Sequence, residues 1–135
     1  MATLIKKSMQ RKVQTKSNFA KRIGIDRNTV KNPGLAMAHN TIPPGGRSGR
    51  DYHLDSAQCI YIIKGRVRWF IGPYSEEIDM EAGDFLYIPR GEIHGNMNLS
   101  DTEPVEEITC HLGVNSFEDD ATVRVEHLWE QQRST

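Results

Sequence analysis

His94 is the residue whose surroundings in the chain most clearly prepare it for chemistry. Gly83 and Asp84 turn the chain into a short apolar stretch, and Pro89 and Gly91 then bend it again. Proline presets φ and glycine tolerates unusual φ values, so both favour such bends. We expect this bend to return His94 to the interior, where an imidazole can bind a metal or transfer a proton. The alternative is a buried histidine whose ring is satisfied by the backbone.

Two further candidate residues precede His94 in the chain. Asp51 and His53 are two residues apart, and alternate residues of a strand point to the same face. If this segment is a strand, both side chains can therefore converge on one site. Asp51 has three possible roles, as a metal ligand, as a general base, or as a hydrogen-bonding residue in the turn before the strand.

The stretch from Gly83 to Asn98 contains, in order, glycine, five residues, proline, one residue, glycine, two residues, histidine, three residues and asparagine. This order resembles the second motif of the cupin superfamily at every fixed position. The first cupin motif is degenerate here. Counting back from its closing glycine, Gly65, places the family's glutamate position on Gln58 and its two histidine positions on Asp51 and His53. The resemblance is to a small single-domain cupin, or monocupin, over residues 34 to 113.

The resemblance implies a divalent metal, Fe, Mn, Ni or Zn, where family members use three histidines and a glutamate. The corresponding ligands in this chain are Asp51, His53, Gln58 and His94. Two histidines and one carboxylate also resemble the ligand set of non-haem Fe(II) oxygenases, which leaves positions for oxygen or substrate. The neutral amide of Gln58 is a weaker donor than a carboxylate. It is therefore either a loose ligand or a polar core residue that hydrogen-bonds across the barrel.

The rest of the chain carries the pattern of an all-β protein. Short stretches rich in β-branched and aromatic residues recur between Gly and Pro turns, a spacing typical of a sandwich or barrel. The predicted strands include Cys59–Ile63, Arg66–Ile71, Phe85–Ile88 and Val105–Leu112. With the resemblance, this predicts a double-stranded β-helix, the cupin jelly roll. In the last of these strands we expect Ile108, Cys110 and Leu112 to face the core and His111 to face away.

Charge divides the chain unevenly although the net charge is only -1. Nine of the 17 Lys and Arg residues lie within residues 1 to 31, with Asp26 as the single acid there. We therefore divide the chain into an N-terminal basic arm, residues 1–33, and a cupin barrel with a C-terminal tail, residues 34–135. We expect the arm to dock on the acidic body or on a partner subunit, because opposite charges attract over about 8 to 10 Å. A nucleic-acid tail and a mitochondrial transit segment are less favoured alternatives.

Three further local patterns bear on secondary structure and on the cysteines. Helix is most plausible over Asn18 to Val30 and over Val125 to Gln132. Residues 19–31 also resemble a helix-turn-helix, but Pro33 and Gly34 cut the second helix short, so a plain strand or arm leading into the barrel is the favoured interpretation. Cys59 and Cys110 lie in apolar stretches and are expected to be free, buried thiols.

Together these features favour a cytoplasmic enzyme. No apolar run approaches the length of a membrane span, and Lys6 and Lys7 follow the first five residues directly, which is unlike a secretory signal. We expect a homodimer, no membrane association, nucleic acid as an improbable partner, and a small oxygenated or aromatic ligand in the barrel. The favoured function is metal-dependent catalysis, either oxygenase-like, hence an oxidoreductase, or lyase- or isomerase-like. The alternatives are a metal-free dehydratase or isomerase using Asp51 and His94 as catalytic residues, and a non-catalytic sensor or binding protein.

Overall fold

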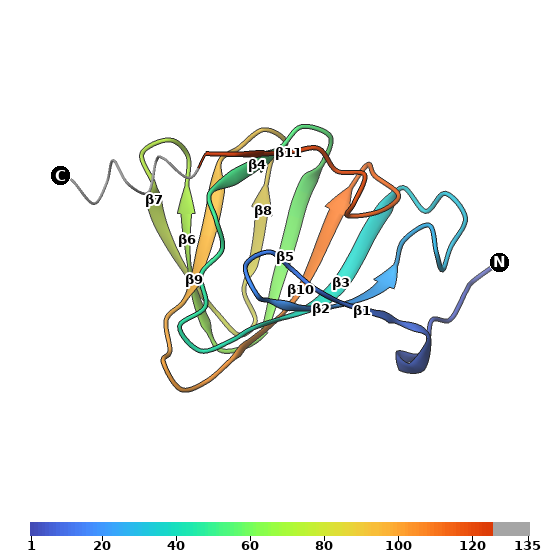
Figure 1. Cartoon of the computed structure of the whole chain (residues 1–135), viewed down its shortest axis with the longest axis horizontal. Coiled ribbons are helices and arrows are strands. Elements are labelled where there is room, and N and C mark those ends of the chain that lie inside the picture. Colours follow the sequence, from blue (N-terminus) through green and yellow to red (C-terminus); the bar gives the residue numbers. More distant parts are fainter. Residues whose placement is uncertain (126–135) are drawn as a thin grey trace.

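The computed structural model describes residues 1–125 as two antiparallel β-sheets (Figure 1). The strands of the first sheet follow the order β1-β2-β3-β10-β5-β8, and those of the second the order β11-β4-β9-β6-β7. The elements are the 3₁₀ turn η1 Lys7–Met9, β1 Arg11–Gln14, β2 Ala20–Ile25, β3 Leu35–Ile42, β4 Asp51–His53, β5 Ala57–Lys64, β6 Arg66–Ile71, β7 Glu76–Glu81, β8 Phe85–Ile88, β9 His94–Asn98, β10 Val105–Leu112 and β11 Thr122–Arg124. The all-β prediction is confirmed, and three of the four strands named from the sequence have the predicted bounds.

The inner faces of the two sheets enclose both an apolar core and a polar cavity. Alternation along each strand directs every second side chain inward. The inward apolar side chains form one cluster, which comprises Phe19, Ile42, Ile60, Ile62, Val67, Trp69, Met80, Ile88 and Val105. Inward positions of β3, β5, β9 and β10 also carry the polar side chains that line a cavity: Asn40, Gln58, His94, Asn96, Glu107 and His111.

The N-terminal arm forms part of the first sheet. β1 pairs with β2, and β2 pairs with β3, all antiparallel and within the same chain. Arg11 contacts Asp26 at 2.9 Å and Glu118 at 2.8 Å, and Arg27 contacts Asp119. The basic arm is thus docked on acidic residues of its own chain. The division of the chain at residue 33 remains a proposal.

The helix predicted over Asn18 to Val30 is wrong. Asn18 has a φ of 67°, which closes the turn between β1 and β2, and residues 20–25 then pair with β3. The alternative of a strand leading into the barrel is correct, because backbone pairing with β3 satisfies the groups that a short, unpartnered helix would leave exposed. Of the predicted C-terminal helix, residues 126–132 lie outside the described residues.

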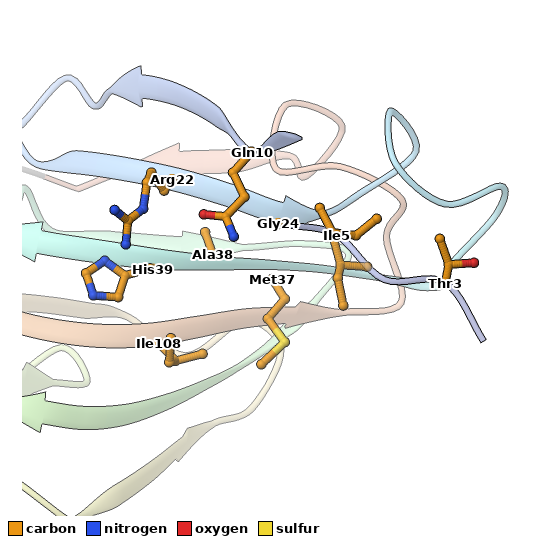
Figure 2. Close-up of a pocket in the computed structure, with 10 residues that line it drawn as sticks. Thr3, Ile5, Gln10, Arg22, Gly24, Met37, Ala38, His39 and Ile108 are labelled. Atoms are coloured by element: carbon orange, nitrogen blue, oxygen red, sulfur yellow. The ribbon is translucent and has the colours of Figure 1, made fainter. Parts of the chain in front are cut away.

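The outer face of the first sheet carries a shallow groove of about 270 Å³ beneath the first residues of the chain. Figure 2 shows Ile5 and Thr3 beside Met37 of β3, with Arg22, His39 and Ile108 further along the same face. The groove is larger than the inner cavity, but its titratable side chains are only Arg22 and His39. It therefore offers much less chemistry than the interior.

Cys59 and Cys110 are free, as predicted, but half-buried rather than buried. They lie opposite each other on β5 and β10, on the outer face of the sheet. Within residues 1–125, no helix has the length and apolar character needed to cross a membrane.

Candidate functional site

The polar cavity between the sheets has a volume of about 170 Å³. Both sheets and the arm contribute side chains to it. Its lining includes all four residues that the resemblance singled out, together with several that it did not: Asp51, His53, Gln58 and His94, and then Lys21, Asn40, Asn96, Glu107 and His111. The fold thus brings the candidate residues to one place.

His94 is buried at the start of β9, directly opposite Asp51 of β4. Its Nδ1 lies 2.9 Å from the carbonyl oxygen of Glu92 and so donates to it, which leaves Nε2 as the nitrogen with a free lone pair. That Nε2 lies 3.4 Å from Oδ1 of Asp51. The bend that turns His94 inward is the predicted one. Gly91, with a φ of 82°, donates its N–H to the carbonyl of His53 at 2.9 Å.

Position 95, directly after His94, has room only for glycine. A Cβ on Gly95 would lie 2.8 Å from Cδ of Arg50 and 2.9 Å from the carbonyl oxygen of Gly49. This close approach seats β9 against the segment that leads into β4. It thereby fixes the distance between His94 and Asp51.

His53 stands between two other imidazoles. Its ring centroid is 5.1 Å from that of His94 and 4.7 Å from that of His111. Burial, with smaller contributions from the neighbouring His111 and His94, lowers the pKa of His53 to about 4. The imidazole is therefore neutral at physiological pH, which is the form that binds a metal. Its Nδ1 lies 3.0 Å from Oγ1 of Thr122, and this contact leaves Nε2 available.

These three side chains fit a divalent ion. One donor atom from each of Asp51, His53 and His94 lies within 4.8 Å of the other two. Two imidazoles bound to one ion at angles of 90° to 109° would have centroids roughly 4.5 to 5.2 Å apart, given metal–nitrogen bonds of about 2.1 Å. The His53–His94 separation falls in that range.

Gln58 has features of both interpretations offered for it. Its Nε2 donates to Oγ1 of Thr109 on the adjacent strand at 3.0 Å, as a polar core residue would. Its Oε1 is buried and, within residues 1–125, has no hydrogen-bond partner. A buried amide oxygen left unsatisfied is costly and calls for a donor or a cation in the cavity. Its role as a weak metal ligand therefore remains a proposal.

The expected orientation of His111 is wrong. His111 is buried and faces the cavity, whereas Ile108 and Cys110 lie on the outer face. Glu107 and Thr109 are buried with it, so the inward side of β10 is polar over most of its length. The prediction assumed an apolar interior. Polar residues occupy every second position of this strand from Glu107 to His111. Given a polar site inside the barrel, this alternation indicates that His111 faces inward.

Asp120 gave no signal in the sequence, yet it organises one side of the site. Its Oδ2 accepts a hydrogen bond from Nδ1 of His111 at 2.7 Å and another from Ser56, and it lies 3.5 Å from Nδ1 of His53. Burial alone raises the pKa of Asp120, but the hydrogen bonds from His111 and Ser56 outweigh it and lower that pKa. A buried, ionised carboxylate thus contacts Nδ1 of two of the three imidazoles, those of His111 and His53.

Comparison with known proteins now identifies the family. The family model described as "Cupin domain" matches residues 38–110. The chain belongs to the cupin family. A comparison with curated protein sequences finds no significant match. The relatives therefore come from solved structures.

A structure of Bacillus subtilis oxalate decarboxylase resembles this cupin with a TM-score of 0.70 and 21% identity, over 88% of this chain and 31% of that one. The chain thus spans about a third of that relative's length. A variant of Streptomyces PAC13 with uridine gives a TM-score of 0.72 and 13% identity, over 96% and 97% of the two chains. A double-stranded β-helix protein from Klebsiella pneumoniae gives 0.67 and 15%, over 84% and 90%. At these identities the likeness establishes the shared jelly-roll fold.

Proposed function

We propose that this cupin is a metal-dependent enzyme that acts on a small oxygenated or aromatic compound inside the barrel. The metal is a divalent ion, Fe, Mn, Ni or Zn, with Asp51, His53 and His94 as ligands and Gln58 as a weaker fourth donor. The observation that carries this proposal is the convergence of one carboxylate and two imidazoles within 4.8 Å. Manganese has a precedent in the fold, since Bacillus subtilis oxalate decarboxylase has Mn(II) centres.

A metal bound there would polarise an oxygen of the substrate and stabilise negative charge that develops on it. The chain's own residues set the conditions for this step. The Glu92 carbonyl holds His94 in the tautomer that presents Nε2, and Thr122 with Asp120 restrains the His53 ring. The narrow cavity limits the substrate to a small molecule, and a bound substrate would displace water from it, which strengthens the electrostatic interactions there. Oxidoreductase and lyase or isomerase chemistry are both compatible with this site.

A metal-free enzyme is the second candidate, and one contact favours it. Nε2 of His94 lies 3.4 Å from Oδ1 of Asp51, so a proton can pass between the two groups with little movement. In this case Asp51 and His94 would share the proton transfers of a dehydration or an isomerisation. The same two residues serve both proposals, and only the presence of the ion separates them.

Substitutions at Asp51 and Gln58, the two positions that differ from the family's ligand set, distinguish the metal-dependent enzyme from the metal-free one. With a metal present, Gln58→Glu adds a negative donor and should tighten binding of the ion, whereas Asp51→Asn removes one and should loosen it. Without a metal, Asp51→Asn should abolish turnover and leave metal content negligible. Titration of the full-length protein with Mn²⁺ and Zn²⁺ measures both affinities. Equal affinities in wild type and both variants would reject the metal proposal.

We further propose a homodimer and a cytoplasmic location. Support for the dimer comes from large apolar side chains exposed on the outer face of the first sheet, Phe85 and Tyr87 among them. The two free cysteines support a reducing compartment, because thiols in oxidising compartments tend to form disulfides. Cell fractionation with antibody detection tests the location.

A further inference from the structure

Lys21 is a cation at the wall of the cavity, supplied by the N-terminal arm. It lies on β2, directly opposite Asn40 of β3, and Asn40 in turn lies opposite Glu107 of β10. Lys21, Asn40 and Glu107 therefore form one row across three neighbouring strands, and all three line the cavity. Ile23, two residues further along β2, is 1% exposed, which identifies this side of the strand as the inner one.

The charge of Lys21 has no carboxylate to neutralise it. Among residues 1–125, no Asp or Glu oxygen lies within 4.0 Å of its Nζ, which instead sits 3.9 Å above the ring centroid of Phe117. Burial lowers the pKa of Lys21 to about 8, and the more distant Glu107 and Glu118 offset part of this effect. A buried cation without a counter-ion is costly, so its presence in a cavity needs an explanation.

Glu107 does not provide the missing negative charge. It is 2% exposed, and within the described residues its carboxyl group makes no hydrogen bond or ion pair, although its backbone pairs in the sheet. Burial raises the pKa of Glu107 to about 8, although Lys21 lowers it somewhat. Near neutral pH the side chain is therefore largely a protonated carboxyl, which can donate a hydrogen bond to a ligand. Asn40 and Asn96 each have a buried amide oxygen with no partner in residues 1–125. The cavity wall therefore also has hydrogen-bond acceptors that a ligand could satisfy.

A bound anion would supply the counter-ion that Lys21 lacks. The neutral imidazoles of His53 and His111 occupy the neighbouring wall, and Lys21 contributes to the lowered pKa of each. An anionic group bound at Lys21 would therefore lie close to the proposed metal ligands. The cavity of about 170 Å³ has room for roughly six water volumes, which is the size of a small organic acid.

We propose that Lys21 binds an anionic group of the ligand, and that the ligand of this cavity is a small carboxylic acid. The inference deepens the proposed function by naming its substrate class, and it rests on that function only for the second point of attachment. One end of the acid would lie beside Asp51, His53 and His94, and its carboxylate would accept from the Lys21 ammonium. Glu107 and Asn40, on the same row, would hydrogen-bond to the remaining polar atoms.

The test measures binding of formate, acetate, oxalate and malonate to the full chain by calorimetry, in Mn²⁺-loaded and metal-free protein. Lys21→Met removes the charge and keeps most of the side-chain volume. We expect it to weaken binding of at least one of these acids about 10- to 100-fold, the usual value of a charge-assisted hydrogen bond. Lys21→Arg should retain most of the affinity. Lys16→Met, an exposed lysine in the preceding turn, is the matched control and should change it less than about twofold.

Further readouts separate this proposal from the metal proposal. Metal content should be the same in Lys21→Met and wild type, and the dependence on Lys21 should persist in metal-free protein. Lys21→Gln serves if Lys21→Met does not fold, as judged by circular dichroism. If none of the four acids binds the wild-type protein, or if both charge-removing variants bind them as tightly as wild type, Lys21 is not an anion-binding residue.

Discussion

Each imidazole of the proposed metal site has a polar contact at Nδ1, the nitrogen that faces away from the proposed ion. The Glu92 carbonyl accepts from Nδ1 of His94, and Thr122 and Asp120 lie against Nδ1 of His53. Such contacts fix the tautomer and the ring orientation, so that Nε2 of each ring is presented to the cavity before any ligand arrives. Pre-organisation of this kind reduces the entropy lost when an ion binds.

Asp120 should therefore govern metal affinity although it is not among the proposed ligands. Asp120→Asn keeps the shape but removes the charge that faces His53 and His111. We expect it to weaken binding of Zn²⁺ or Mn²⁺ about 10- to 100-fold, the range usual for residues that orient metal-bound histidines. Asp119→Asn changes the adjacent, exposed carboxylate and is the control. Equal affinities in wild type and Asp120→Asn, measured by competition with a chelating dye, would remove Asp120 from the account.

Glu107 predicts a pH dependence of stability in the metal-free protein. Its pKa is about 8 in the folded chain and near 4.5 when exposed, so unfolding between these values releases a proton. The contribution of this group to stability is thus present below pH 4.5 and is lost as the pH rises to 8. Glu107→Gln has no such loss. Its melting temperature should exceed that of wild type by more than about 5 °C at pH 8 and converge with it towards pH 5. A constant difference between the two proteins from pH 5 to pH 8 would contradict this.

At the scale of whole elements, the sequence predicted most where turns and β-rich stretches alternate. β6, β8 and β10 have the predicted bounds because Gly and Pro residues delimit them. β7 was not predicted, since Glu76–Glu81 is acid-rich and its pairing with β6 determines its structure instead. The orientation of β10 was wrong because a period of two cannot distinguish the inner face from the outer one when the cavity is polar. The inward position of Lys21 could not be predicted, because its basic segment forms a strand only by pairing with β3, which is distant in the sequence.

The β1–β2 arm should depend on Asp26, which is 1% exposed. Its carboxylate accepts from the backbone N–H of Asn28 at 2.8 Å and from Arg11 at 2.9 Å. We expect Asp26→Ala to lower the free energy of unfolding by about 2 to 4 kcal/mol, because a buried, charged hydrogen-bond acceptor is lost. Glu118→Ala removes the other, half-exposed partner of Arg11 and should cost less than about 1 kcal/mol. Urea denaturation measures both. Similar losses in the two variants would show that burial of Asp26 is not what anchors the arm.

In the whole molecule, the end of the first sheet at β8 exposes large apolar side chains on its outer face. Phe85 and Tyr87 of β8 are 80% and 61% exposed, and Ile63 of β5, Leu112 of β10 and Met37 of β3 on the same sheet are also exposed. Tyr61 packs against Phe85 with ring centroids 4.7 Å apart, which extends the patch across the sheet. An exposed patch of this kind marks an interaction surface, and two copies of one face can pack about a twofold axis.

The proposed homodimer should form through this face. We expect wild-type protein to have the mass of a dimer by light scattering, and the double variant Phe85→Glu, Tyr87→Glu to be a monomer with an unchanged circular dichroism spectrum. Tyr74→Glu, on the exposed hairpin between β6 and β7, is the control and should remain a dimer. A wild-type monomer at micromolar concentration, or a dimeric double variant, would reject this interface.

We propose that Asp51, His53 and His94 together hold one divalent ion. The most direct measurement is the metal content per chain of the purified protein, after incubation with divalent metal and removal of the excess, by elemental analysis. We predict one ion per chain in wild type and less than about one tenth of that in His94→Ala, because a site with two imidazole ligands loses one of them. An absence of metal from wild type, or stoichiometric metal in a folded His94→Ala variant, would contradict the account.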